Sequence, residues 1–409
     1  MRIGIFTDTY PPFINGVSTS IVMLKKALEK QGHTVYIVTV NNENMKYKYE
    51  EDEKVIRIPG IPVGIYDYRL TGIYPVKIVN KIRKWHLDVI HSQTEFGVGT
   101  FARIIAKQFH IPLVHTYHTM YEDYVHYITK GYFVGTSKKI VEYLTLFYCD
   151  KTISELIVPT EKTKELFKEK YKVNRNVYVI PTGIEIEKFY LENNKNLNIL
   201  EKRNSLGIAK DDFVILFVGR IGTEKNIDLL LNGMDKLIKL SKKNKLLIIG
   251  DGPDMGYYKE YVYKRKLGKN VIFTGKVPWD SISEYYLIAD IFATASVTET
   301  QGLTVIEAMA AGLPVVCIND ESFTGTIMNN VDGIIFNNLE EYIEAITKLY
   351  QDRELLKNLG KKARIDAEKY SSEKFATSVL EVYRTAIKKN RKIVIPLVDT
   401  IKEVFKEND

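Results

Sequence analysis

Cysteine is scarce in this sequence, because only Cys149 and Cys317 occur among 409 residues. Two distant cysteines offer no disulfide framework, and their scarcity is typical of a reducing compartment. Long apolar runs are also missing, since none approaches the roughly 18 to 20 residues that a membrane-spanning helix needs. The first residues, MRIGIFTDTY, predict a strand and a turn rather than a secretory signal, because Asp8 interrupts a short apolar stretch.

Two common nucleotide-binding patterns are absent as well. The sequence contains neither a P-loop nor a complete G-x-G-x-x-G turn, which argues against a flavin or nicotinamide site. Acidic residues are relatively few in the first half: residues 1–185 contain 25 Lys and Arg against 19 Asp and Glu, and the remainder contains 33 against 32. Either the first half meets an anionic surface, or lysines cluster there by chance.

The chain is too long for one ordinary hydrophobic core, so we expect two domains. Short apolar runs alternate with longer amphipathic ones, which is the pattern of βαβ units and a parallel sheet. The predicted strands are RIGIF, TVYIVTV, KVIRIPG, DVIHSQ and PLVHTYH in the first half, and FVILFVGRI, NKLLIIGDGP, NVIFTGKV, DIFATAS and LPVVCI in the second. The sequence therefore predicts an α/β protein with two doubly wound, Rossmann-like domains.

We place the domains at residues 1–185 and 186–375, with a helical segment at 376–409 that packs back on the first domain. The first helix is expected over STSIVMLKKALEKQG, capped by Ser18 or Thr19 and ended by Gly32. Ligands of doubly wound sheets bind beyond the carboxyl ends of the strands. The unusual turns fall there, at 8–16, 116–119, 219–225, 250–253 and 298–302, which predicts one cleft between the domains.

Two of these turns suit an anion. FVGRIGTEKN (217–226) places Arg220 and Lys225 between a predicted strand and a predicted helix, as a diphosphate site requires. The alternative is a solvated charged loop. NGVSTS (15–20) opens the first helix, where Gly16 lets the backbone approach a ligand and the helix N-terminus favours an anion. An ordinary capped turn is the alternative there.

Histidines gather in VHTYHTMYEDYVHY (114–127). Their spacing is not a recognised zinc pattern. We favour one functional imidazole, His118, at the end of a strand, where it can hydrogen-bond a substrate hydroxyl or a developing charge. The alternative is simple packing of a segment rich in tyrosine and histidine.

Two glutamates stand out in TETQGLTVIEAMAAGLPVV (298–316). Glu299 lies in a predicted loop, and Glu307 lies in the second turn of a helix that begins near Gly302. A buried carboxylate needs partners, and vicinal hydroxyls can supply two hydrogen bonds to it. Two carboxylates beside a helix N-terminus predict a nucleotide-sugar site, whereas the alternative for Glu307 is an ion pair in the core.

In combination, E299-x7-E307, GR…EK at 219–225, GDGP at 250–253 and GLPVV at 312–316 resemble the retaining glycosyltransferases of family 4, which have the GT-B fold. The resemblance covers nearly the whole chain. It implies that Arg220 and Lys225 bind the donor diphosphate, that Glu307 holds the ribose and that Glu299 holds the sugar hydroxyls. The remaining donor-binding positions that it implies are Gly16, Gly219, Gly250, Lys276, Val277, Gly302 and Leu303.

Further roles follow from the same resemblance. Residues 274–278 would face the base, commonly uracil, and His118 would contact the sugar near the reacting carbon, as a catalytic residue alongside Glu299, Arg220 and Lys225. Front-face attack would retain the anomeric configuration, with the leaving diphosphate taking the acceptor proton. No protein nucleophile, bound cofactor or resident metal is implied, although stimulation by Mg²⁺ stays open.

A possible membrane contact is YPVKIVNKIRKWH (74–86), which predicts a basic amphipathic helix. Its apolar stripe contains Ile78, Ile82 and Trp85, and an adjacent stripe contains Lys77, Lys81 and Lys84. Such a helix can lie in an anionic membrane interface, or it can be a crossover helix on its own sheet. We expect further membrane or acceptor contacts at Tyr121, Tyr132 and Phe133.

MRIGIF, NGVSTS, HTMYEDYVHYI and TETQGLTVIEA are most similar to bacterial glucosyltransferases that act on diacylglycerol. This implies a peripheral enzyme at the cytoplasmic face of the cell membrane. It would move glucose from UDP-glucose to the 3-hydroxyl of 1,2-diacylglycerol, making α-monoglucosyldiacylglycerol, without a nucleic-acid partner. The alternatives are another glycolipid or a polysaccharide precursor as acceptor, or a UDP-sugar epimerase. Gln301 stands where the family commonly has an aromatic residue.

Overall fold

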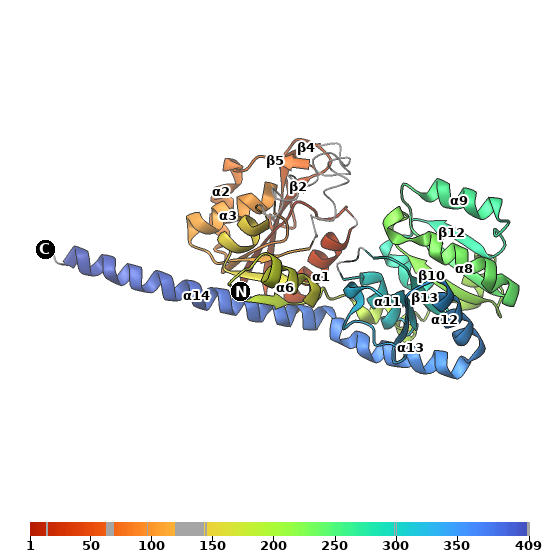
Figure 1. Cartoon of the computed structure of the whole chain (residues 1–409). Helices are drawn as coiled ribbons and strands as arrows, with labels where there is room; N and C mark the ends of the chain where they lie inside the picture. Colours follow the sequence, from red (N-terminus) through yellow and green to blue (C-terminus); the bar gives the residue numbers. More distant parts are fainter. Residues whose placement is uncertain are drawn as a thin grey trace. The chain divides into compact units, whose positions relative to one another are not determined.

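The chain forms two compact units, which Figure 1 shows with the helices and strands labelled. Unit 1 comprises Met1–Gly183 together with Ser372–Asp409, and unit 2 comprises Ile184–Ser371. The computed structural model describes residues 1–13, 15–62, 69–95, 97–118, 143, 145–297, 299 and 301–406, and for 391–406 only the backbone. No helix in this described part is both long and apolar enough to cross a membrane.

Unit 1 is built around one twisted, mainly parallel sheet. Among the described residues its strands lie in the order β3-β4-β2-β1-β6-β7-β8-β9, with β5 beside β4. The strands are β1 (Arg2–Phe6), β2 (Thr34–Asn41), β3 (Lys48–Glu50), β4 (Val55–Pro62), β5 (Arg69–Thr71), β6 (Val89–Ser92), β7 (Leu113–Thr116), β8 (Glu155–Val158) and β9 (Val177–Val179). The chain runs outward from β1 in one direction and then returns to β6 on the other side of β1.

Helices cover both faces of this sheet. Helices α1 (Gly16–Lys30) and α14 (Ser372–Lys406) pack on one face, and α2 (Val76–Trp85) and α3 (Gly97–Phe109) pack on the other, while α6 (Glu161–Glu165) follows β8. The strands are buried on both faces, so they read as nearly continuous apolar runs in the sequence. The apolar residues of α14 that join the core include Phe375, Val379 and Tyr383.

The first helix begins earlier than the sequence predicted. Asn15 is the N-cap residue, and its side-chain oxygen accepts a hydrogen bond from the Ser18 backbone N–H at 2.8 Å. The prediction of Ser18 or Thr19 as the cap was wrong, because Asn15 satisfies the same orphan donor one turn before them. The helix ends at Lys30, and Gly32 follows with a positive φ of 80°.

Unit 2 contains a second parallel sheet, with strand order β12-β11-β10-β13-β14-β15 in the described chain. The strands are β10 (Phe213–Val218), β11 (Asn244–Ile249), β12 (Val271–Gly275), β13 (Ile291–Thr294), β14 (Val315–Ile318) and β15 (Gly333–Phe336). The helices are α7 (Ile199–Ser205), α8 (Ile227–Leu240), α9 (Met255–Lys264), α10 (Ile282–Leu287), α11 (Leu303–Ala310), α12 (Leu339–Gln351) and α13 (Arg353–Ala367). All five strand pairs are parallel.

The predicted fold class is confirmed, since both units are doubly wound sheets with helices on each face. The ten predicted strands are present, and the sequence analysis missed β3, β5, β8, β9 and β15. Three of these missed strands, β3, β5 and β9, are only three residues long. Such short runs carry too few residues for a period to be recognised.

Two glycines bring the ends of β10 and β11 into close contact. Gly250 has a φ of 135°, and a Cβ atom at this position would lie 1.8 Å from the carbonyl oxygen of Gly219. The backbone N–H of Gly219 donates to the carbonyl of Ile249 at 3.0 Å, which continues the strand pairing into the turn. No side chain fits at Gly250. The two turns that contain Gly219 and Gly250 therefore present backbone atoms at the carboxyl end of the sheet.

Replacing Gly250 with alanine should therefore destabilise unit 2. We expect a loss on the order of 2–4 kcal/mol, because the new Cβ combines a backbone clash with an unfavourable φ. The thermal denaturation midpoint of the whole chain measures this effect. Gly268→Ala is the matched control, since an added Cβ there meets no atom within 4 Å. Equal midpoints for the two variants would contradict the prediction.

Candidate active site

The strand order of unit 2 locates its binding edge. The order reverses between β10 and β13, which are neighbours in the sheet although β11 and β12 lie between them along the chain. The loops that follow two such strands diverge to opposite faces, which leaves an opening at the carboxyl end of the sheet. The loop after β10 contains Gly219, Arg220 and Lys225, and the loop after β13 contains Glu299 and Gly302. The predicted donor-binding residues thus converge on one opening.

Lys225 joins the two loops. Its ammonium group forms an ion pair and a hydrogen bond with the Glu299 carboxylate, and it lies 3.4 Å from the Ser296 hydroxyl oxygen. The Lys225 side chain is 16% exposed and the Glu299 side chain 23% exposed, so both can still be reached by a ligand. Lys225 also ends a short 3-10 turn, Thr223–Lys225, directly before α8. A cation therefore lies beside a carboxylate at the N-terminal end of a helix.

Arg220 lies in the same loop with a more exposed side chain. Its side chain is 41% exposed, and its guanidinium lies 3.7 Å from the Glu224 carboxylate. The planar fork of an arginine suits the oxygens of a diphosphate. The structure thus places Arg220 and Lys225 beside one opening, as the sequence predicted, but with different degrees of burial.

A helix N-terminus completes this edge of unit 2. Gly302 is the N-cap residue of α11, and its φ of 70° lies in the left-handed region. A Cβ atom there would also approach the Phe323 ring to 2.9 Å. The backbone N–H groups of Leu303 and the next residues begin the helix without an acidic side chain in the first turn. This end of α11 can therefore bind an anion through backbone N–H groups.

Glu307 is more deeply buried than the sequence analysis assumed. Its side chain lies on α11 and is 4% exposed, and the hydroxyl of the fully buried Tyr286 donates a 2.6 Å hydrogen bond to it. Burial raises the pKa of Glu307 to about 7, although the Tyr286 hydrogen bond and the nearby Lys188 charge oppose this shift. The direct partner is thus a tyrosine hydroxyl rather than the arginine or lysine of a core ion pair.

The remaining predicted positions of unit 2 lie at neighbouring strand ends. Gly250 directly follows β11, and Lys276 and Val277 follow β12. Lys276 is exposed, whereas Val277 is half-buried and packs against the apolar core under the sheet edge. Gln301 is buried, with 6% of its surface exposed.

Unit 1 has its own reversal of strand order, between β1 and β6. Asp8 follows β1 and joins the two loops there: its carboxylate accepts from the Thr94 hydroxyl at 2.6 Å and from the Val98 backbone N–H at 2.9 Å. Burial raises the pKa of Asp8, and these hydrogen bonds oppose the shift. Gly16, the first residue of α1, has open space where a Cβ would be, so the helix itself does not require a glycine there.

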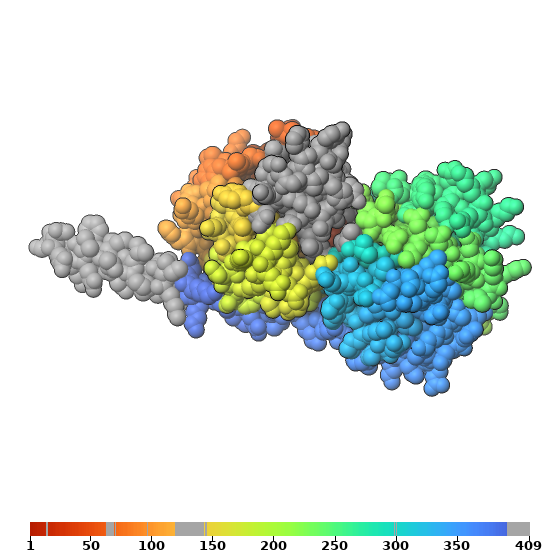
Figure 2. Space-filling model, viewed as in Figure 1, coloured from red at the N-terminus to blue at the C-terminus, as the bar shows by residue number. Residues whose placement is uncertain are grey.

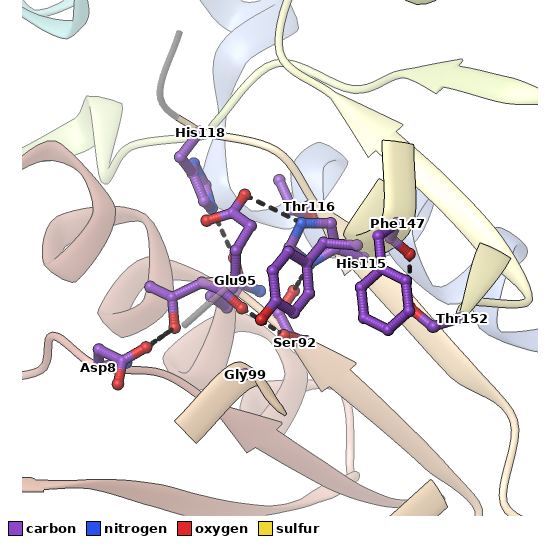
Figure 3. A network of polar contacts seen from close by, with 12 residues as sticks. Asp8, Ser92, Glu95, Gly99, His115, Thr116, His118, Phe147 and Thr152 are labelled. Carbon is purple, nitrogen blue, oxygen red and sulfur yellow. Dashed lines mark hydrogen bonds and ion pairs between the residues drawn. The ribbon is translucent and has the colours of Figure 1, made fainter. Parts of the chain in front are cut away.

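His118 lies directly after β7, as predicted, inside a buried polar network (Figure 3). Its Nε2 atom is 2.6 Å from the side-chain oxygen of Gln93. Burial lowers the pKa of His118 to about 4, so the imidazole is neutral at physiological pH. A neutral imidazole can donate from one ring nitrogen and accept at the other.

A second histidine in this network faces a carboxylate. His115 Nδ1 lies 2.9 Å from the Ser92 carbonyl oxygen, and His115 Nε2 lies 3.2 Å from Glu95 Oε1. Because a carbonyl only accepts, Nδ1 carries a hydrogen, and a proton or another cation must separate Nε2 from the carboxylate. Among the described residues, Glu95, His115 and Cys149 have the spacing of metal ligands, with their ligand atoms within 4.8 Å of one another. Burial raises the pKa of the Cys149 thiol well above its usual range.

The basic helix at 74–86 corresponds to α2, and its apolar stripe is buried. Ile78, Ile82 and Trp85 belong to the core of unit 1, and the Trp85 ring stacks on Tyr36 with 4.7 Å between ring centroids. The expectation that Trp85 contacts a membrane was wrong, because the stripe faces the sheet of its own unit. Lys77 and Lys84 are exposed, whereas Lys81 pairs with Glu53.

Three predicted contact residues, Tyr121, Tyr132 and Phe133, lie outside the described residues. Sequence reasoning also missed Gln93 and Tyr286, which hold His118 and Glu307, and it missed the polar contacts made by Asp8, Thr94 and Glu95. No local motif identifies them, because each acts on a partner from a different part of the chain. Asp8, Gln93, Thr94 and Glu95 share one feature that the sequence could have shown, because each lies in a loop that begins where a buried strand ends.

The raised pKa of Glu307 predicts a pH-dependent stability. The folded pKa of about 7 lies above the ordinary value of 4.5. Ionisation of the buried carboxyl is therefore unfavourable, and the free energy of unfolding falls as pH rises from 4.5 through 7. Glu307→Gln should remove the effect and stabilise the chain at pH 8 by at most about 3 kcal/mol, with little change below pH 4.5. Thermal midpoints across this range measure it. A difference between variant and parent that does not vary with pH would contradict the prediction.

The two halves of the chain match known sequence families. Residues 14–188 match the model for "Glycosyltransferase Family 4", and residues 198–366 match that for "Glycosyl transferases group 1". The structure is also similar to that of HepE from Anabaena in complex with UDP-glucose. The TM-score is 0.70 at 17% sequence identity, covering 94% of this chain and 100% of the other. This likeness concerns the fold.

Curated relatives extend over nearly the whole chain. The chain is 37% identical to the "Alpha-monoglucosyldiacylglycerol synthase" of Acholeplasma laidlawii, which covers 96% of this chain and 99% of that one. It is 38% identical to the protein of the same name from Streptococcus pneumoniae, with 95% and 87% covered. On the strength of this similarity over nearly the whole chain and of the two family matches, the chain belongs to glycosyltransferase family 4.

Proposed function

We propose that the protein transfers glucose from UDP-glucose to the 3-hydroxyl of 1,2-diacylglycerol at an anionic lipid surface, making α-monoglucosyldiacylglycerol. The observation that carries the proposal is the pairing of Lys225 with Glu299 at the β10–β13 edge, directly before α11. The acceptor and the hexose are supported by the names of the two relatives that are 37% and 38% identical. The likeness to HepE, which was solved with UDP-glucose, agrees with the proposed donor.

In the proposed reaction, Arg220, Lys225 and the N-terminus of α11 neutralise the donor diphosphate. Glu299 accepts hydrogen bonds from sugar hydroxyls, and Glu307 accepts them from the ribose. The bond between the anomeric carbon and the diphosphate oxygen breaks, and the acceptor oxygen bonds to the same face of that carbon. The acceptor proton passes to the departing diphosphate, so UDP leaves and the anomeric configuration is retained. Stabilising the developing negative charge on UDP is the main task of the protein in this scheme.

The experiment offers a panel of UDP-sugars to the full chain with diacylglycerol in anionic vesicles, with Mg²⁺ and with EDTA. We expect one product, a glycolipid whose sugar is α-linked glucose by NMR. Formation of a water-soluble glycoside would favour a soluble acceptor, and conversion of the UDP-sugar to its epimer without an acceptor would favour an epimerase. The absence of any glycolipid overturns the proposed acceptor.

Lys225→Met should lower kcat/KM of this transfer by about a hundredfold or more, because the variant loses a cation at the leaving group and leaves Glu299 without its partner. Lys236→Met is the matched control, since Lys236 forms an exposed ion pair with Glu340 on the surface of unit 2. We expect the control to retain the parent activity. Equal kcat/KM values for the two variants would remove Lys225 from the donor site.

The lipid contact is proposed in unit 1 near the start of α2, rather than along the buried stripe of this helix. Ile61, Ile73 and Val76 are 61%, 60% and 69% exposed. Ile61 and Val76 line a largely apolar cavity of about 500 Å³, whose other lining residues are Met45, Tyr47, Ile58, Pro59, Thr71, Gly72, Tyr74 and Pro75. Helix α2 belongs to the orange part of the surface in Figure 2. Exposed apolar side chains beside the exposed Lys77 suit an anionic membrane surface.

The double variant Ile73→Glu with Val76→Glu should reduce binding to anionic vesicles by at least about tenfold, since it replaces apolar contact with negative charge. Sedimentation with vesicles of increasing anionic lipid content measures the affinity. Leu240→Glu in unit 2, where Leu240 is 59% exposed, serves as the control for adding a charge at an exposed apolar site. Unchanged binding of the double variant would move the lipid contact elsewhere.

A further inference from the structure

Gln93 is the partner of His118 in unit 1. It follows β6, its backbone N–H donates to the Phe6 carbonyl at 2.9 Å, and its side chain is 3% exposed. The side-chain oxygen lies 2.6 Å from His118 Nε2. Both residues extend from the ends of neighbouring parallel strands, so the contact joins β6 to β7 at the edge where strand ends gather.

The other end of the Gln93 amide is held as well. Its nitrogen lies 3.1 Å and 3.2 Å from the two ring nitrogens of His91. The His91 ring is fixed in turn by hydrogen bonds of 2.7 Å with the Tyr383 hydroxyl and the Thr116 hydroxyl. His91 and Tyr383 are both buried, and their rings meet edge to face. The structure places the amide oxygen toward His118 and the amide nitrogen toward His91, which Tyr383 of α14 contacts in turn.

This orientation decides which ring nitrogen of His118 carries the hydrogen. An amide oxygen only accepts hydrogen bonds, so the hydrogen of the Gln93–His118 contact must lie on Nε2. A neutral imidazole carries a single N–H hydrogen, which leaves the lone pair on Nδ1. His118 can then accept a hydrogen bond at Nδ1 but cannot donate one there.

We propose that Gln93 is a positioning residue of the transfer reaction, which holds His118 in the Nε2-protonated form so that Nδ1 accepts a hydrogen bond from a substrate hydroxyl. The inference rests on the proposed transfer reaction, to which it adds His118 as a residue of unit 1 that contacts a substrate. His118 then orients that hydroxyl as a neutral acceptor and takes no part as an acid. Tyr383 contacts His91, and His91 contacts Gln93. The Nε2-protonated form of His118 therefore depends on the packing of α14.

Several titratable groups face the Gln93–His118 pair and contribute to any pH dependence of the His118 protonation state. Glu95 follows β6 and favours the charged form of His118, whereas His115 on β7 opposes it. His91 on β6 and Tyr383 on α14 are both fully buried, and burial holds both in their neutral forms. The neutral amide of Gln93 adds no charge of its own to this set.

Direct evidence comes from ¹⁵N NMR of the histidine rings in the full chain at pH 7. The signals of His118 are assigned by their loss in His118→Ala. We expect the Nε2-protonated form in the parent and a mixture of both forms in Gln93→Leu. A parent ring protonated on Nδ1 overturns the inference, whatever the enzyme transfers, so this outcome is separate from a failure of the proposed function.

Kinetics of two variants test the role in the reaction. Gln93→Leu should lower kcat by about tenfold or more, as loss of an orienting partner typically does. The same change made in His118→Ala should cost nothing further, because the residue that Gln93 positions is gone. Additive losses would mean that Gln93 supports the fold only. Gln351→Leu, an exposed site at the end of α12, controls for the substitution.

Gln93→Glu keeps the acceptor atom and adds a charge that favours imidazolium. The variant should gain an acid limb in the pH profile of kcat, because a doubly protonated ring can no longer accept at Nδ1. The profile is measured at saturating donor, since the titration of Glu307 is expected in KM instead. A kcat profile identical to that of the parent overturns the inference, provided that thermal denaturation shows a folded variant.

Discussion

The reversal of strand order is the constraint on which both units depend. When a parallel sheet is extended first on one side of a strand and then on the other, the two loops at the reversal leave on opposite faces. In unit 2 the reversal lies between β10 and β13, and Lys225 and Glu299 meet in the loops there. In unit 1 it lies between β1 and β6, and Asp8 and Thr94 meet in the loops there. The same topology produces a charged, ligand-accessible edge in one unit and a buried polar network in the other.

The two carboxylates at the edge of unit 2 differ in their partners. Glu299 has a cation beside it, whereas Glu307 accepts a hydrogen bond from a tyrosine hydroxyl and is so deeply buried that its pKa rises to about 7. Such a carboxylate is costly to the folded protein in the absence of a ligand. In the proposed function the ribose hydroxyls donate further hydrogen bonds to Glu307. Donor binding then recovers part of the free energy that burial of this carboxylate costs the free chain.

Much of this could be read from the sequence because parallel strands are buried on both faces and end at one edge. The apolar runs therefore located ten strands, and the loops that follow them located Arg220, Lys225, Glu299 and His118. The partners could not be read in the same way. Gln93 and Tyr286 act across loops and strands, and an amphipathic helix such as α2 shows the same pattern whether its stripe faces lipid or its own sheet. Only the packing of Trp85 against Tyr36 decides between them.

The path of the chain has a consequence for synthesis. Unit 1 is interrupted at Gly183 and resumes at Ser372, with all of unit 2 between these points. Tyr383, which anchors His91 and thereby Gln93, belongs to the resumed part. A ribosome therefore completes unit 2 before it delivers the helix that covers one face of the first sheet. Until α14 emerges, the nascent chain has a sheet face that α1 covers without α14, and His91 lacks its contact with Tyr383, so a dependence on chaperones during translation should concentrate in this interval.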